Sequence, residues 1–193
     1  LKEGDLLFQD LDSSPLCDAI ELVTTGHNNA NFSHIGLIVS QNGNLKVLEA
    51  IPPKVKLTDI ENFLNKSKDA KGNPKVIVGR LKNKHKHSIT KAVNFAKKKI
   101  GEDYDDFFLI NNNQYYCSEL IYEAFSEDSI FQLKPMTFLD PVIGDTLQTW
   151  KKYYSDLGIK VPQNQLGINP GAMSLSEKIE IVHTYGIPDG MLK

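Results

Sequence analysis

The sequence predicts an α+β fold in which a small antiparallel sheet or barrel packs against helices. Strand-like runs of apolar residues are concentrated between residues 34 and 81, and helical spacing dominates the segments on both sides. The pair Asn42-Gly43 joins two apolar runs, which is the strongest short-range signal of an antiparallel hairpin. The 193 residues, of which 40% are hydrophobic and 24% charged, fit a single globular domain.

The first thirty residues predict one strand, one helix and a loop. Residues 4–8 have the pattern of a turn that runs into a short buried strand. Residues 12–15, Asp-Ser-Ser-Pro, are a helix-start signal, and the apolar residues after them recur at helical spacing up to Val23. Residues 24–31 are polar and contain glycine, so we expect a loop there.

The middle of the chain predicts the sheet. Residues 34–39 and 45–51 form the two strands of the hairpin. Thr58-Asp59-Ile60-Glu61 has the form of a capping box and opens a short helix. Residues 75–81 follow a turn and predict a further strand.

Two helices follow this strand. Ser88 is expected to cap a helix that ends at Gly101, and three lysines near its end complement the helix dipole. A second helix begins at Cys117, because the apolar residues after it recur at helical spacing.

We divide the domain into a core of about residues 1–130 and a helical extension of about residues 131–193. Helical spacing in the extension predicts one helix near residues 147–157 and another near residues 175–182. We expect the extension to pack on the core and shape a pocket wall. The aromatic residues proposed for this wall are Phe138, Trp150, Tyr153 and Tyr154.

Charge and hydropathy exclude several kinds of partner. The formal net charge of -2 gives no basic footprint for nucleic acid or an acidic membrane surface. No apolar run approaches the length of a transmembrane helix. The chain begins at Leu1 rather than Met, and we expect that a preceding segment has been removed.

The two cysteines, Cys17 and Cys117, leave the cellular compartment open. They could form a disulfide, which their separation in the sequence does not forbid, but this bond would block the Cys117 thiol. Cys17 lies on an apolar helix face and is most simply a core residue.

Cys117 stands where its helix begins, and this position favours the thiolate. Unpaired backbone N–H groups and the positive end of the helix dipole lie there. Taken alone, the pattern also fits a small apolar residue under a helix. Glu119 lies in the same first turn, where it either supports the helix start or meets a substrate amine.

The hairpin predicts a second group of reactive residues. A turn at Asn42-Gly43 places Gly36 opposite Glu49, so that His34 and Glu49 are diagonal neighbours on one face. A carboxylate that binds one imidazole nitrogen fixes the tautomer and makes the other nitrogen more basic. The alternative is a buried histidine with an acid neighbour by chance.

Four segments together resemble the NlpC-type branch of the papain-like cysteine peptidases and amidases. They are Gly4-Asp5-Leu6, Ser33-His34-Ile35-Gly36-Leu37, Leu48-Glu49-Ala50 and Tyr116-Cys117-Ser118-Glu119-Leu120. Their order is shuffled, since the cysteine segment comes last instead of first. The chain is therefore similar to the circularly permuted group represented by YiiX/YebB-like bacterial proteins, over roughly residues 1–130.

The resemblance implies a role for each matching residue. Cys117 would be the nucleophile, His34 the base and then the acid, and Glu49 the orienting residue. Tyr104, with the Cys117 backbone N–H, would stabilise the oxyanion, although a plain core aromatic is nearly as good an interpretation. The remaining substrate-binding candidates from the matching segments are Tyr116, Ser33 and Glu119.

The resemblance also implies a cysteine amidase or peptidase that needs no cofactor. The substrate would carry an amide to an amino acid or short peptide, of cell-wall or lipid-linked origin, and the protein would lie in the bacterial cell envelope. A thioester-forming acyltransferase and a non-catalytic binding module are the alternatives. No metal site is predicted, because His27, His85, His87 and His183 lack ligand spacing.

Overall fold

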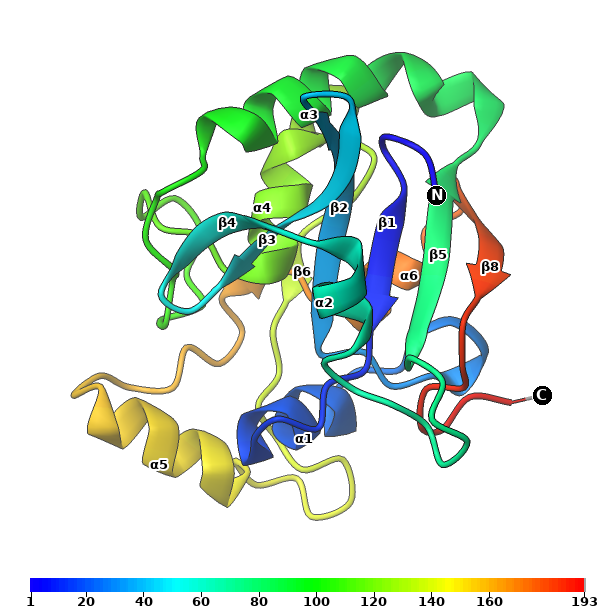
Figure 1. Ribbon diagram of the computed structural model, residues 1–193. Helices are drawn as coiled ribbons and strands as arrows, with labels where there is room; N and C mark the ends of the chain where they lie inside the picture. The colour runs from blue at the N-terminus through cyan, green and yellow to red at the C-terminus, as the bar shows by residue number, and fades with distance from the viewer. Residues whose placement is uncertain (193) are drawn as a thin grey trace.

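The computed structural model describes residues 1–192 and contains one six-stranded antiparallel sheet with helices on both faces (Figure 1). The strand order is β4-β3-β2-β1-β5-β8. The sheet is open, with β4 and β8 at its edges, so the α+β prediction is confirmed and the barrel alternative is wrong. The six strands are β1 (Leu6–Gln9), β2 (His34–Gln41), β3 (Asn44–Ile51), β4 (Lys54–Thr58), β5 (Val76–Leu81) and β8 (Ile179–Thr184).

A second, two-stranded sheet joins β6 (Lys134–Pro135) and β7 (Leu166–Gly167). The α-helices are α1 (Pro15–Leu22), α2 (Ile60–Leu64), α3 (Ile89–Lys98), α4 (Cys117–Ala124), α5 (Gln148–Asp156) and α6 (Pro170–Ser174). Short 3-10 turns are η1 (His27–Asn29), η2 (Asn83–Ser88) and η3 (Ser126–Asp128).

The two faces of the sheet bury different helices because side chains alternate along each strand. Leu6 and Phe8 of β1 join the larger core, which includes α3 and α4. Leu7 points to the other face and joins a smaller core that Phe63 of α2 completes. In Figure 1, α2 accordingly lies in front of the strands and α4 behind them.

The hairpin has the predicted register. Leu37 pairs with Leu48, and Gln41 pairs with Asn44, which places Gly36 and Glu49 opposite each other one step further along. The turn contains only Asn42 and Gly43, both with positive φ, as the Asn-Gly signal requires.

The glycine at position 36 makes room for packing partners on the α2 side. A Cβ there would collide with Val47 and press on Phe63. The space that the missing side chain leaves is therefore filled by these two apolar residues.

Two local predictions need correction. Residues 54–58 form edge strand β4, so Thr58 ends a strand instead of opening a capping box, and Asp59 is the N-cap of α2. Ser88 does not cap α3 with its side chain. Its hydroxyl donates to the His85 carbonyl at 2.6 Å, within η2.

The extension is only partly helical. The predicted helix near residues 147–157 is confirmed as α5, but the one near residues 175–182 is wrong. Strand β8 lies there and pairs with β5. The residues Ile179 and Ile181 alternate with Glu180, a pattern of period two that the exposed edge of β5 converts into a strand.

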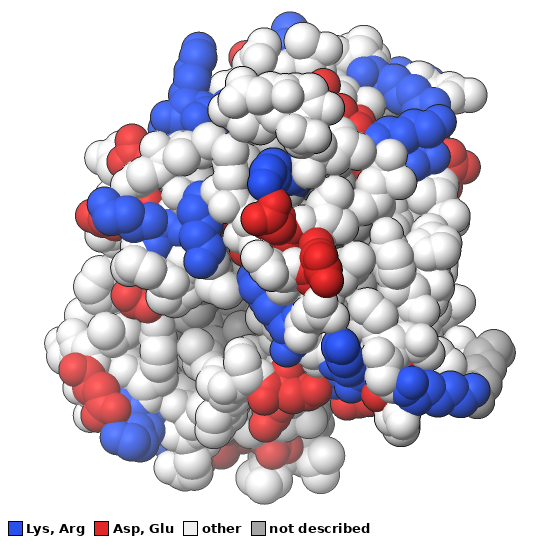
Figure 2. Space-filling view, in the orientation of Figure 1, with Lys and Arg blue, Asp and Glu red and all other residues white. Residues whose placement is uncertain are grey.

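Both cysteines are buried and free, so the possible Cys17–Cys117 disulfide is absent. Basic and acidic side chains are intermingled on the face shown in Figure 2. Among residues 1–192, no helix combines the length and the apolarity that crossing a bilayer requires.

Candidate active site

Cys117 is the first residue of α4, as predicted. Tyr116 precedes it with extended backbone angles, and the Tyr116 N–H donates to the Glu119 carboxylate at 3.4 Å. The thiol is 7% exposed, and its Sγ lies 3.9 Å from the Ser33 carbonyl oxygen. A helix start therefore presents this sulfur to the residue directly before β2.

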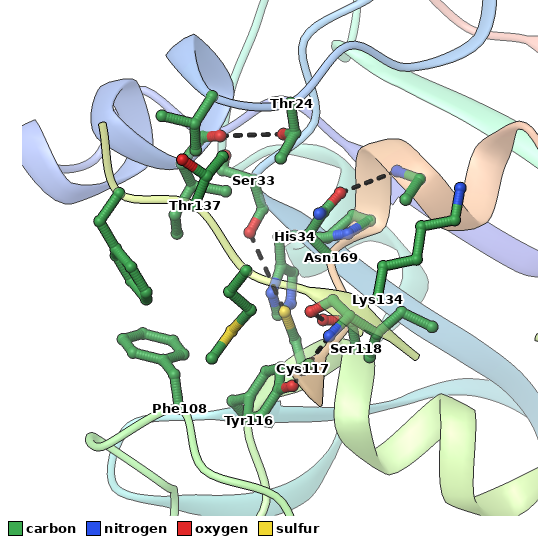
Figure 3. A pocket seen from close by; sticks show the side chains of 18 of the residues that line it. Thr24, Ser33, His34, Phe108, Tyr116, Cys117, Ser118, Lys134, Thr137 and Asn169 are labelled. Carbon is green, nitrogen blue, oxygen red and sulfur yellow. Dashed lines mark hydrogen bonds between the residues drawn. The ribbon is translucent and has the colours of Figure 1, made fainter. Parts of the chain in front are cut away.

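His34, the first residue of β2, lies beside this sulfur (Figure 3). Its Nε2 is 2.6 Å from Glu49 Oε2, and both side chains are buried. The Nε2 contact leaves the other ring nitrogen for Cys117, whose hydrogen bond to the imidazole raises the pKa of His34. The structure thus brings the thiol, the imidazole and the carboxylate together, with the imidazole in contact with both of the others.

Glu49 has two further partners that the sequence did not indicate. The Thr58 hydroxyl donates to Oε1 at 2.5 Å. The Lys66 ammonium donates to both oxygens, at 2.8 Å and 2.7 Å. Every oxygen of this buried carboxylate is therefore hydrogen-bonded, which buried charge requires.

Charge and burial have opposite effects on the pKa values of the His34–Glu49 pair. Burial alone would lower the pKa of His34, but hydrogen bonds and negative charge from Cys117 and Glu49 raise it to about 9. Burial alone would raise the pKa of Glu49, but His34 and then Lys66 lower it to about 2. At neutral pH the pair therefore consists of an imidazolium and a carboxylate.

Tyr104 and Tyr116 both line the pocket beside Cys117. Burial raises the pKa of Tyr104 well above its ordinary value, and the charge of Cys117 adds to this effect. The Tyr116 hydroxyl accepts a hydrogen bond from the Ile168 N–H at 3.2 Å. This bond ties α4 to the segment before α6.

Ser33 lines the pocket, whereas Glu119 does not. The Ser33 hydroxyl accepts a hydrogen bond from the Leu11 N–H at 3.0 Å, and the Ser33 carbonyl oxygen faces the Cys117 sulfur. Glu119 is fully buried and outside the pocket lining. Burial, with the charges of Asp105 and Glu123, raises its pKa to about 8, and its contact with Tyr116 supports the helix start.

The pocket over Cys117, called the Cys117 pocket below, has a volume of about 210 Å³ and mainly apolar walls. Phe138 and Trp150 of the extension line it, as predicted. Tyr153 and Tyr154 are not part of the lining; their rings pack against Trp150, Phe108 and Phe138. The other apolar walls come from Ile20, Val23, Phe108, Met136 and Ile168.

Thr58 could have been found from the sequence and Lys66 could not. Once residues 54–58 are recognised as a strand, the pairing of Lys56 with Glu49 puts Thr58 diagonal to Glu49 on the same face. Lys66 follows α2 in an irregular segment with no periodic pattern, and only the tertiary fold brings it to Glu49.

A second charge cluster lies outside the pocket, with Asp10 and Lys75 buried and Asp12 and Asp189 exposed. Asp10, Asp12 and Asp189 are near enough to share a metal ion. The ammonium of Lys75 already lies 3.1 Å, 2.7 Å and 3.1 Å from their oxygens. This ammonium partly balances the carboxylates, and its contacts link Asp189 near the end of the chain to the ends of β1 and β5.

An antiparallel sheet, a helix-start cysteine and a histidine–carboxylate pair define the papain-like class of cysteine hydrolases. Residues 1–183 match the family of permuted papain-like amidase enzymes, YaeF/YiiX, C92. The chain belongs to this family and is an enzyme of the cysteine amidase or peptidase type.

Two relatives are similar over most of the chain. Uncharacterized protein YiiX of Escherichia coli strain K12 is 24% identical over 170 residues, which is 88% of this chain and 80% of that protein. The crystal structure of the metalloprotein yiiX from Escherichia coli O157:H7 superimposes with a TM-score of 0.75 and 22% identity, covering 96% of this chain and 98% of that one. The second comparison confirms the fold.

Proposed function

We propose that this enzyme hydrolyses an amide through a thioester on Cys117, with His34 as acid and base and Glu49 as the orienting residue. The observation that carries the proposal is that the His34 ring lies between the Cys117 sulfur and Glu49, with 2.6 Å between His34 Nε2 and Glu49 Oε2. A sulfur that shares a hydrogen bond with an imidazole held by a carboxylate is an activated nucleophile.

The proposed reaction has two steps. In the first, the Cys117 thiolate attacks the amide carbonyl, and the His34 imidazolium gives its proton to the leaving amine. In the second, neutral His34 takes a proton from water, the hydroxide attacks the thioester, and the acid product leaves with the thiolate restored. Glu49 holds the ring in one tautomer and balances its charge in both steps.

In this proposal, two groups stabilise the tetrahedral oxyanion. The Cys117 backbone N–H is at the first position of α4, where intrahelical partners are missing. Tyr104 lines the same pocket as the Cys117 sulfur, so its hydroxyl is the second candidate donor. Donors that are fixed by the fold stabilise the developing charge without having to reorient during the reaction.

The proposed chemistry is carried by the thiol, the imidazole and the carboxylate alone. The relative from Escherichia coli O157:H7 is described as a metalloprotein. In this chain the Lys75 ammonium occupies the space among the three aspartates, so these residues do not fit a metal ion. No step is therefore routed through a metal.

Trapping the acyl-enzyme tests the proposal. The protein is mixed with an N-acyl 4-nitroanilide, quenched in acid and mapped by mass spectrometry. We expect an acyl group on Cys117, loss of nearly all turnover in Cys117→Ala, and unchanged turnover in Cys17→Ala, the matched control. Turnover that survives in Cys117→Ala would overturn the assignment.

The same trap separates the alternatives. Water should clear the acyl group. If an added alcohol or amine clears it and water does not, the enzyme is an acyltransferase. If no acyl group forms with any acyl donor while the chain remains folded, the site binds a ligand without turnover.

A further inference from the structure

A second hollow, lined by lysines, adjoins the Cys117 pocket. We call it the basic groove; it has a volume of about 710 Å³. Its charged lining consists of four lysines and one carboxylate, that of Glu177. The four lysines are Lys82, Lys84, Lys134 and Lys178.

These lysines have little internal compensation. In the described part of the chain, Lys82, Lys84 and Lys134 form no side-chain ion pair, and the Lys178 ammonium donates only to the Ser129 carbonyl at 2.6 Å. Elsewhere, buried Lys75 has three carboxylate partners. The groove thus keeps a surplus of positive charge that an anion can balance.

His85 supplies an independent sign of a missing ligand. Its side chain lines the groove, and its buried Nε2 has no hydrogen-bond partner among the described residues. Burial lowers the pKa of His85, and nearby basic residues lower it further. These residues are Lys84, Lys178, His87 and Lys82. A buried ring nitrogen without a partner is uncommon, and a turn of the His85 ring toward the groove would allow a bound polar group to satisfy it.

The basic groove and the Cys117 pocket share a wall. Gln132, Lys134, Ile168 and Ala172 line both hollows. Lys134 in Figure 3 extends from the strand that borders the Cys117 pocket. One molecule can therefore touch the apolar walls near the sulfur and, past Lys134, the lysines of the groove.

We propose that the substrate is an amphiphilic anion, whose apolar part fills the Cys117 pocket and whose carboxylate or phosphate lies in the basic groove. This inference rests on the proposed amidase function for the cleavage, but the anion site stands on the groove alone. Lys134 and Lys84 bind the anion.

Binding can be measured without turnover, because Trp150 is the single tryptophan of the chain and lines the Cys117 pocket. Its fluorescence is followed during titration of the full chain with octyl phosphate, octanoate and 1-octanol. We expect an anion to bind at least about tenfold more tightly than the alcohol, and the difference to shrink at high salt. The stronger of the two anions identifies the head group.

A charge-matched pair of variants locates the site. Lys84→Met combined with Lys134→Met should weaken the favoured anion by about tenfold or more and leave 1-octanol within about twofold. Lys86→Met combined with Lys91→Met removes the same charge outside the groove lining and should change neither ligand. Equal binding of the three ligands, or equal effects of the two double variants, would overturn the inference.

Turnover separates this inference from the proposed function. N-octanoyl-5-amino-2-nitrobenzoate carries a carboxylate that N-octanoyl-4-nitroanilide lacks, and both release a coloured amine. We expect kcat/KM to favour the acidic amide, and the groove variant to remove that preference. Equal cleavage of the two amides refutes the anion preference and leaves the amidase standing. Tight anion binding without Cys117-dependent cleavage refutes the amidase and leaves the anion site standing.

Discussion

Replacing Glu49 by Gln tests the charge balance of the site. The pKa of His34 stands at about 9 against an ordinary 6.5. Since one pKa unit is a factor of ten, Cys117 and Glu49 together favour the imidazolium by roughly 300-fold, net of burial. Cys117 contributes part of this factor, so we expect Glu49→Gln to lower kcat/KM at pH 7 by roughly 10- to 100-fold.

The direction of the pH profile distinguishes this cause from simple damage. Without the carboxylate, the buried imidazolium loses its partner and the positive charge of Lys66 is no longer neutralised, so the pKa of His34 falls. The alkaline limb of kcat/KM should then move from near pH 9 toward lower pH.

The assay is hydrolysis of a chromogenic amide between pH 5 and 10, with unfolding by denaturant measured on each variant. Glu61→Gln, on the exposed side of α2, removes a carboxylate that does not touch His34 and should leave the profile unchanged. An alkaline limb that stays in place in Glu49→Gln, in a folded protein, would refute the reasoning.

Three further predictions follow from the same contacts. Lys66→Met removes the cation beside Glu49, so the alkaline limb of kcat/KM should shift to higher pH, opposite to Glu49→Gln; no shift would exclude a positioning role for Lys66. Gly36→Ala forces a Cβ against Val47 and should lower the free energy of unfolding by about 1–3 kcal/mol in urea titrations. The ionised His34–Glu49 pair should contribute most to the free energy of unfolding between about pH 4.5 and 6.5. The contribution of Glu49 is lost as the pH falls through about 2, and that of His34 is lost as the pH rises through about 9. Thermal melts measured across this pH range check the prediction.

The parts of the site that could be predicted depend on local signals. The Asn42-Gly43 turn fixes the hairpin register, and the register fixes that His34 and Glu49 share a face. The helix start at Cys117 is equally local, because the apolar spacing after it is regular. The contact between the sulfur and the imidazole is not local, and only the family resemblance suggested it.

The parts that could not be predicted depend on pairing between distant segments. Strand β8 forms because β5 offers an unpaired edge, although the same residues also fit helical spacing. Lys66 reaches Glu49 through the packing of α2 against the sheet. For Glu119, position beside Cys117 allows either helix support or a substrate contact, and only the packing shows that its side chain is buried and supports the helix start.

Alkylation by iodoacetamide at pH 6 tests the central claim most directly, because the chain carries its own control. Both cysteines are buried, but only Cys117 lies against His34. An ordinary thiol, with a pKa near 8.5, is almost fully protonated at this pH and reacts slowly. Peptide mapping should show carbamidomethyl on Cys117 well before Cys17, and His34→Ala should remove the difference. Equal rates in the unmodified sequence, or a Cys117 rate that His34→Ala leaves unchanged, would contradict the account.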